Sequence, residues 1–269
     1  MTSVMLAFAT SSILGVPFGA WTGDYFSWEA PFFIIALGTL LCMMGISRMN
    51  PVATGIKPDK VFTQYLELFQ LWKLSTVRKL FLAQFFMLVG LFGLIPNMGV
   101  WMTLNMGMSA TQVGLCYMQG GVGGVIGNQL SGLLLRRFSK TTVVILGSVL
   151  MGMVLFLFTN IPFYQHFPVM VAGLFMAGMM LGGSMRMPAF QLILSEAVPI
   201  SMRGRLMSMS MIVANISMGV GGVWSTPMLT IENDQLQGVP LIGIVTIFTV
   251  LIFVPLFYSA RKETAESYS

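Results

Sequence analysis

Two apolar stretches joined by a short basic loop decide the fold of this chain. The first is Gln112–Leu135 (QVGLCYMQGGVGGVIGNQLSGLLL), the loop is Arg136–Lys140 (RRFSK), and the second is Thr141–Phe158 (TTVVILGSVLMGMVLFLF). Both are apolar on all sides and approach or exceed the roughly 20 residues that a helix needs to cross a bilayer. Strands of a membrane barrel would be about ten residues long and would alternate in polarity. The pattern therefore predicts a helical hairpin in a membrane.

The composition of the whole chain agrees with this prediction. Of its 269 residues, 56% are hydrophobic and 9% are charged, whereas about a quarter of an ordinary soluble domain is charged. The net charge of +5 is small and no basic cluster alternates with aromatic residues, which argues against nucleic acid as a partner. Two cysteines and one histidine provide neither a disulfide framework nor a zinc or haem site. The 25 methionines are scattered, so we interpret them as packing residues and expect no metal and no cofactor.

Eight apolar segments are separated by short polar connections, which predicts an all-α polytopic membrane protein with eight transmembrane helices. The segments are approximately Val4–Trp21, Pro31–Ser47, Leu80–Leu104, Gln112–Leu135, Thr141–Phe158, Pro168–Leu194, Leu206–Leu229 and Val239–Tyr258.

The basic residues fall in every second connection. Every Lys and Arg except Arg186 lies in residues 48–79, 136–140, 203–205 or 261–262, which eight spans place on one face. The other face carries the lone histidine and four acidic residues: Asp24, Glu29, His166, Glu232 and Asp234. Basic loops stay in the cytoplasm. We therefore expect a multi-pass protein of the cell membrane with both termini in the cytoplasm.

The longest connection divides the chain into two spans and six spans. We expect two helices over residues 1–47, a cytoplasmic linker over 48–78, a six-helix bundle over 79–260 and a cytoplasmic tail over 261–269. Within the linker, Phe62–Lys73 places Tyr65, Leu68, Phe69 and Trp72 at helical spacing. An amphipathic helix on the membrane surface and an ordinary linker helix both fit this spacing.

Four short motifs are spread over the chain. They are Gly15-Val-Pro17-Phe-Gly19, Ser27-Trp-Glu29-Ala-Pro-Phe32, Gly132-Leu-Leu-Leu-Arg136-Arg137-Phe-Ser-Lys140, and Arg186-Met-Pro188 with Val198-Pro199 and Arg203-Gly204. With the two-plus-six layout, they resemble the major facilitator superfamily, and within it arabinose-efflux-like and drug-antiporter-like permeases. The first motif resembles the antiporter motif of the fifth helix. The third resembles the loop signature Gly-x-x-x-Asp-Arg-x-Gly-Arg, with Arg136 in place of the Asp, and Glu29 stands where Arg is usual.

The resemblance runs from the fifth helix of that family to the C-terminus, so it implies two helices of the N-terminal half plus a complete six-helix C-terminal half. Nothing in the chain corresponds to the first four helices. The implied function is secondary active efflux of a small molecule, such as a sugar or a drug, by alternating access. The family resemblance suggests coupling to protons, but the predicted spans contain no carboxylate that could carry a proton. Membrane lipid and the small molecule are the expected partners, and we expect no enzyme activity. The alternative is a non-transporting membrane remnant or an assembly partner.

Arg186 is the one basic residue inside a predicted span. A charge there is costly and usually faces a cavity or a partner, so Arg186 is a candidate anion anchor or gating contact. A depth of about 27 Å from the outer end of its helix, at 1.5 Å per residue, also allows the side chain to snorkel to the cytoplasmic interface.

The other candidates for substrate binding are amides and one aromatic residue. Asn97 follows Pro96, which frees a backbone carbonyl, and Trp101 lies one turn further on the same face. Gln119 and Asn215 are amides of other spans. Each amide can equally join helices. We interpret Gly15, Pro17, Gly19, Gly132, Arg137, Arg203 and Gly204 as structural motif residues, the glycines of the first span allowing close packing between the two halves.

The distribution of charge yields a topology that labelling can test. Single cysteines at Lys60, Arg137, Arg203 and Lys262 should react with an impermeant thiol reagent from the cytoplasmic side. Cysteines at His166 and Glu232 should react from the opposite side, because the positive connections stay inside. Labelling of the Arg137 and His166 sites from one side would contradict the eight-span arrangement.

Overall fold

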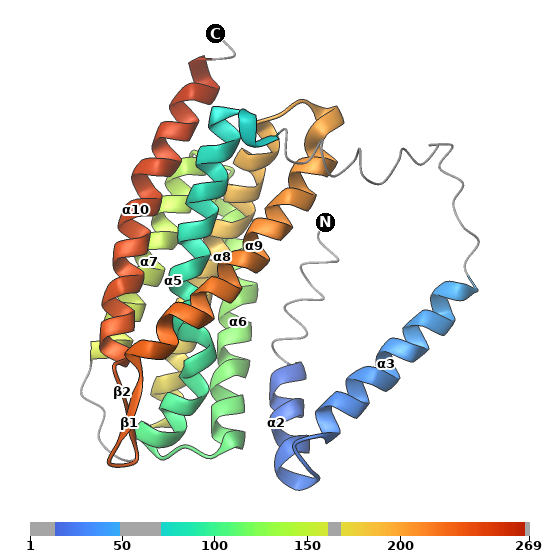
Figure 1. The fold of residues 1–269 in the computed structure, drawn as a ribbon, viewed down its shortest axis with the longest axis vertical. Coiled ribbons are helices and arrows are strands. Elements are labelled where there is room, and N and C mark those ends of the chain that lie inside the picture. Colours follow the sequence, from blue (N-terminus) through green and yellow to red (C-terminus); the bar gives the residue numbers. More distant parts are fainter. Residues whose placement is uncertain (1–13, 49–70, 161–167, 267–269) are drawn as a thin grey trace.

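The computed structural model describes residues 14–48, 71–160 and 168–266, and these residues are mostly helical (Figure 1). The helices are α2 (Val16–Tyr25), α3 (Ala30–Ser47), α5 (Ser75–Met106), α6 (Ala110–Leu134), α7 (Lys140–Asn160), α8 (Val169–Glu196), α9 (Arg203–Ser225) and α10 (Val239–Glu266). Short 3₁₀ turns precede α5 (Leu71–Lys73) and α9 (Ile200–Met202) and follow α9 (Thr226–Met228). Apart from Leu71–Lys73, the expected amphipathic segment lies outside the described residues.

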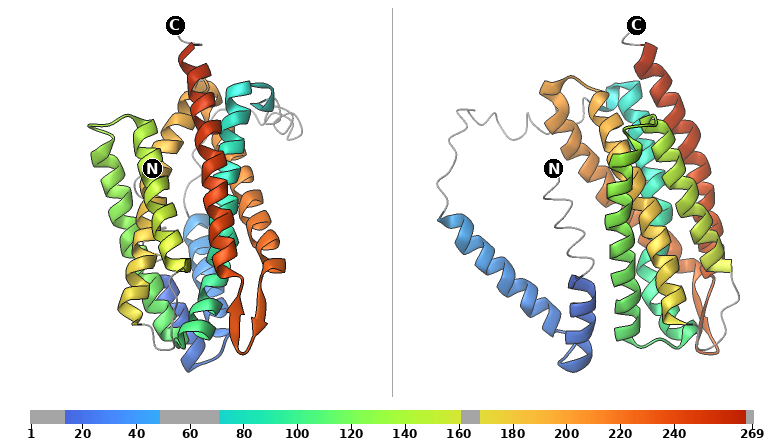
Figure 2. Two further views of the ribbon diagram at one scale, coloured as in Figure 1. Left: turned by 90° about the vertical axis from the view of Figure 1, so that its left-hand side faces the viewer. Right: turned by 180° about the vertical axis from the view of Figure 1, so that it is seen from behind.

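Helices α5 to α10 stand side by side as one bundle, as the views in Figures 1 and 2 agree. Helix α2 packs against α6, and α3 packs against α2 and leads away from the bundle. Apolar side chains are exposed on every face of α3; examples are Phe32, Phe33, Ile35, Leu37, Leu40 and Met43. Such a helix needs lipid or further helices around it.

Five described helices are long and apolar enough to cross a membrane: α5, α7, α8, α9 with its flanking turns, and α10. Helix α3 is a shorter apolar helix, and only ten residues of α2 are described as α-helix. Helix α6 has 25 residues, seven of them glycine. The structure thus supports a helical protein with several membrane spans. The count of eight and the division into two helices and a six-helix half stay predictions.

The ends of the helices follow local sequence signals. Gly107 adopts φ +66° after α5, a left-handed conformation that glycine adopts without strain. Ser109 and Gln112 then form a reciprocal capping box that starts α6. At the other end of the chain, α10 continues to Glu266 instead of ending near residue 260, because Arg, Lys, Glu and Ala are good helix formers.

A small β-hairpin connects α9 to α10. The hydropathy pattern did not predict this hairpin. Strands β1 (Thr230–Glu232) and β2 (Gln235–Gln237) pair antiparallel, and both turn residues have positive φ, Asn233 at 52° and Asp234 at 58°. This is the geometry of a two-residue type I′ turn, which favours Asn and Asp. The side-chain amide of Asn105 in α5 donates to the Leu236 carbonyl (3.1 Å) and accepts from the Leu236 amide (2.9 Å). The hairpin is therefore fastened to the end of α5.

Glycines bring the helix backbones into direct contact. A Cβ on Gly123 of α6 would collide with the backbone of Ala177 in α8, and one on Gly127 would collide with Leu181. A Cβ on Gly182 of α8 would lie 2.7 Å from the Met151 amide nitrogen of α7. Small residues at such contacts let membrane helices approach closely, and the bundle is held this way along α6, α8 and α7.

The packing predicts a different effect for two glycines of the same helix. Gly123→Ala should lower the free energy of unfolding by about 1–3 kcal/mol, because the new methyl group meets backbone that cannot move aside locally. Gly132→Ala is the matched control, since a Cβ there meets nothing within 4 Å. Alanine should leave stability unchanged or raise it through helix propensity. Thermal unfolding of the purified variants in detergent compares them, and equal melting temperatures for both would contradict the packing described.

Candidate functional site

Helix α5 is an acceptor for side chains from four other helices. Its backbone carbonyls between residues 87 and 95 accept hydrogen bonds beyond those of the helix itself, using the second lone pair of each oxygen. The donors are Arg186 of α8 to Met87 (3.2 Å), Trp224 of α9 to Val89 (3.2 Å), Thr246 of α10 to Gly90 (2.9 Å) and Tyr117 of α6 to Ile95 (3.3 Å). The segment before Pro96 is thus the centre of the polar contacts in the bundle.

Arg186 turns inward and does not reach the surface. Its side chain is 1% exposed, and its second guanidinium nitrogen lies 3.5 Å from the Ser148 hydroxyl of α7. Its Nε has no hydrogen-bond partner among the described residues. The side chain therefore joins α8 to both α5 and α7 from the interior of the bundle. Snorkelling to the cytoplasmic interface does not describe this arrangement.

Asn97 and Trp101, two other candidate residues, make their side-chain contacts with different neighbouring helices. The Asn97 amide donates to Gly93 of its own helix (3.1 Å) and to the Ser225 hydroxyl of α9 (3.2 Å). Trp101 is buried, and its ring meets Phe158 of α7 edge to face at 5.2 Å. Although Asn97 and Trp101 lie one turn apart, the first faces α9 and the second faces α7.

Gln119 and Asn215 also lie apart from this pair. The Gln119 amide packs against the backbone of Gly173 in α8, where a Cβ would collide with it. Asn215 is exposed and donates to the Met211 carbonyl of its own helix (2.8 Å). Of these four residues, Asn215 is the one with an exposed side chain. The described contacts therefore do not gather Asn97, Trp101, Gln119 and Asn215 into one cluster.

The glycines of α2 leave open space around them. A Cβ on Gly19 or on Gly23 would meet nothing within 4 Å. Gly15 caps the start of α2, and Pro17 lies in the first turn, where a proline fits a helix without losing a hydrogen bond. Helix α2 therefore packs against α6 without using Gly19 or Gly23 at the contact, and the role expected for the glycine face stays a prediction.

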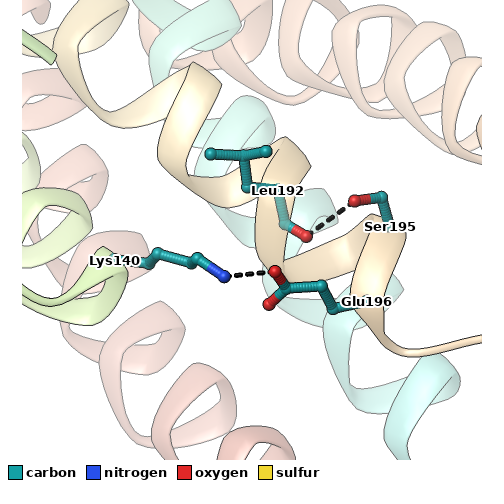
Figure 3. A network of polar contacts seen from close by, with 4 residues as sticks. All are labelled: Lys140, Leu192, Ser195 and Glu196. Carbon is teal, nitrogen blue, oxygen red and sulfur yellow. Dashed lines mark hydrogen bonds and ion pairs between the residues drawn. The ribbon is translucent and has the colours of Figure 1, made fainter. Parts of the chain in front are cut away.

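The basic loop between α6 and α7 is anchored by an ion pair. Lys140 at the start of α7 pairs with Glu196 at the end of α8, as Figure 3 shows, where the Ser195 hydroxyl also donates to the Leu192 carbonyl. A cation at a helix N-terminus and an anion at a C-terminus both oppose the helix dipole. Their pairing offsets two unfavourable placements at once. The remaining motif residues are exposed beside this pair or at the start of α9: Gly132, Arg137, Arg203 and Gly204.

A groove of about 470 Å³ lies between α5 and α6. Its walls are small and apolar residues: Pro96, Gly99, Val100, Leu104, Ala110, Val113 and Gly114. Two hydroxyls, of Thr103 and Tyr117, also line it, and both donate to carbonyls of α5, at Gly99 and Ile95. Their free lone pairs make the groove an acceptor for donor groups on an otherwise apolar molecule.

The sequence pattern does not single out Ser148, Glu196, Tyr117 or Trp224 as functional residues. A signal was available for Glu196, because it is an acidic residue at the end of a span close to a basic loop. The partners of Arg186 and the donors to α5 depend on which faces of different helices meet. One sequence does not contain that information.

The comparisons with known proteins agree with the fold. The family model described as Major Facilitator Superfamily matches residues 1–222 and, in a second match, residues 80–267. One relative is the "Uncharacterized MFS-type transporter YceJ" of Bacillus subtilis (strain 168), which is 27% identical over 254 residues, covering 91% of this chain and 60% of that protein.

A second relative is the "Putative transporter AraJ" of Escherichia coli (strain K12), 27% identical over 133 residues, covering 49% of this chain and 33% of AraJ. The chain thus spans no more than about three fifths of the length of either relative. The family model covers the chain nearly from end to end, and the apolar helices, the basic loop and the bundle fit it. The chain belongs to the major facilitator superfamily of membrane transporters.

Proposed function

We propose that this chain is the larger part of a secondary active transporter that exports a small molecule by alternating access. The observation that carries the proposal is the bundle α5 to α10, in which Gly123, Gly127 and Gly182 bring the backbones of α6, α7 and α8 into direct contact. Alternating access needs two such rigid bodies that rock about a site between them. Membership of the family supports transport as the activity.

The groove between α5 and α6 supports an amphipathic, drug-like substrate more than a sugar. Sugars are bound by amides and carboxylates that are free to receive several hydroxyls, whereas the amides of Asn97 and Gln84 are hydrogen-bonded to α9. The groove offers apolar walls and two hydroxyl acceptors instead. Its volume lies within the range of small-molecule sites, about 300–1,000 Å³.

Proton coupling is the least supported part of the proposal. In the described residues, acidic side chains lie at helix ends or in connections, as with Glu29, Glu196, Glu232 and Asp234. A carboxylate within the membrane is the usual means of carrying a proton through a transporter. If export is proton-coupled, we infer that the coupling acid belongs to helices that pack against the α2–α3 pair.

We predict that Val100→Trp weakens substrate binding by about tenfold, which is 1.4 kcal/mol, because the indole fills the groove. Val100 is half exposed and lines the groove, whereas Val149 of α7 is similarly exposed and does not line it. Val149→Trp is therefore the matched control and should bind normally. Binding of radiolabelled chloramphenicol, a neutral molecule with hydroxyl and amide donors, to the purified chain in nanodiscs measures the effect. Equal loss in both variants, or none in Val100→Trp, would contradict the assignment of the groove.

We further predict that these 269 residues alone perform no net transport. The α2–α3 pair is a single helical hairpin with apolar side chains exposed all round α3, so it does not provide a second rigid body. Proteoliposomes with the purified chain should show no saturable flux of chloramphenicol or of radiolabelled L-arabinose. The chain fused behind the first four transmembrane helices of the Bacillus relative should restore flux of one of them.

Saturable and selective flux through the chain alone would show that the second body is unnecessary. If the fusion folds yet moves neither probe, while the chain alone binds another membrane protein in a fixed ratio, the alternative role of an assembly partner is favoured.

A further inference from the structure

The bundle consists of two groups of three helices. In the first group, α8 packs closely against α6 and α7, with Gly123 and Gly182 at the contacts. In the second, α5 packs against α9 and α10, where a Cβ on Gly221 would lie 2.9 Å from the backbone of Phe92 and one on Gly90 would collide with Thr249. The strongest packing is thus within each group.

The two groups also meet each other along a seam. Helix α7 contacts α10, where a Cβ on Gly243 would collide with Thr159, and the ring of Phe190 in α8 meets those of Phe253 and Phe257 in α10.

Arg186 bridges this seam. One nitrogen of its guanidinium donates to the Met87 carbonyl of α5, across the seam, at 3.2 Å. The other lies 3.5 Å from the Ser148 hydroxyl, which belongs to its own group and itself donates to the Val144 carbonyl at 2.8 Å. Ser148 therefore holds the plane of the guanidinium so that its other nitrogen reaches α5.

A buried charge is a costly way to fill space. A guanidinium taken out of water loses its solvation free energy, and pairing recovers only part of it, so apolar residues of similar size often stabilise a fold more. Arg186 is 1% exposed, and its recorded partners are a carbonyl and a hydroxyl. Unlike an apolar residue, the guanidinium has several N–H donors in a fixed planar arrangement, so it can contact two helices at once.

We propose that Arg186 is a positioning residue that couples the two three-helix groups, so that the bundle moves as one body. A second hydrogen bond crosses the seam, from the Tyr117 hydroxyl of α6 to the Ile95 carbonyl of α5, nearer the other end of the helix. The two links meet α5 eight residues apart, one on each side of its glycine-rich middle. Removing the Arg186 link takes away the hydrogen bond between α8 and α5, while the packing within each group and the contacts of α7 and α8 with α10 stay in place.

Spin labels on the two sides of the seam test this coupling. Leu82 of α5 and Leu192 of α8 are both partly exposed and accept labelled cysteines at the surface of the bundle. The background carries Cys42→Ser and Cys116→Ala, which remove the two native thiols. Double electron–electron resonance on the full chain in nanodiscs then gives the distribution of distances between α5 and α8. Melting temperature is measured on the same samples.

With Arg186 present we expect one narrow distance distribution. Arg186→Met should broaden it or split it into two, while the melting temperature stays equal or rises, because a buried charge has been replaced by an apolar chain of similar length. Arg186→Lys should restore the narrow distribution only in part, since an ammonium contacts one acceptor at a time. A matched change at the surface, Arg203→Met, should alter neither quantity.

Two results would overturn the proposal. The first is a narrow, unchanged distribution in Arg186→Met. The second is a fall in melting temperature in both Arg186 variants with no change in distance, which is the signature of a merely stabilising residue. If Arg186→Met does not fold, Ser148→Ala keeps the test decisive, because it retains the charge and should broaden the distribution through loss of orientation. The readout involves no substrate, so it does not depend on whether the proposed transport activity is correct, although the purpose of the coupling rests on it.

Discussion

Direct contact between helix backbones is the constraint on which the rest of this structure depends. Between helices in lipid the hydrophobic effect is weak, so close packing and interhelical hydrogen bonds supply the stability. Gly123 and Gly127 set the distance between α6 and α8, and Gly147 and Gly182 set that between α7 and α8. Gly90 and Gly221 do the same where α5 meets α10 and α9, and there the short side chains of Thr246 and Ser225 form hydrogen bonds with α5. The polar contacts of the bundle follow from the glycine contacts.

The two ends of the bundle use charge differently from its interior. At the end that carries the basic loop, Lys140 and Glu196 form a half-exposed pair, the kind of pair that contributes little stability by itself. In the interior, Arg186 has neutral partners and is fully enclosed. Positive charges in loops determine which way a membrane protein is inserted. The charge of Arg186 acts instead on the neighbouring helices, and its effect depends on how its hydrogen bonds are placed.

Much of the fold follows from the sequence, and most of the site does not. Hydropathy locates α6, α7 and α8 almost to their ends, because the span length is set by the bilayer, whereas α5 starts earlier and α10 ends later than their apolar spans. The same reasoning places Arg186 inside a helix but gives no partner for it, since the rotation of α8 relative to α5 depends on packing across the bundle. Asn97 and Trp101 illustrate this limit. Their spacing puts them on one side of α5, yet α5 is central and has a different neighbour on each flank of that side. The hairpin of Asn233 and Asp234 could have been predicted from that dipeptide, because it suits a type I′ turn.

The way in which Asn105 holds the hairpin has a practical consequence. A side-chain amide presents an N–H donor and a carbonyl acceptor side by side, as a strand would, and the Asn105 amide uses both on the backbone of Leu236. The hairpin is therefore anchored at its base, and the exposed tip at Asn233 and Asp234 contributes little to holding it. A small rigid domain inserted at that tip would inherit the orientation of the bundle. It would serve as a fiducial for imaging the bundle, whose described residues lie mostly in long apolar helices.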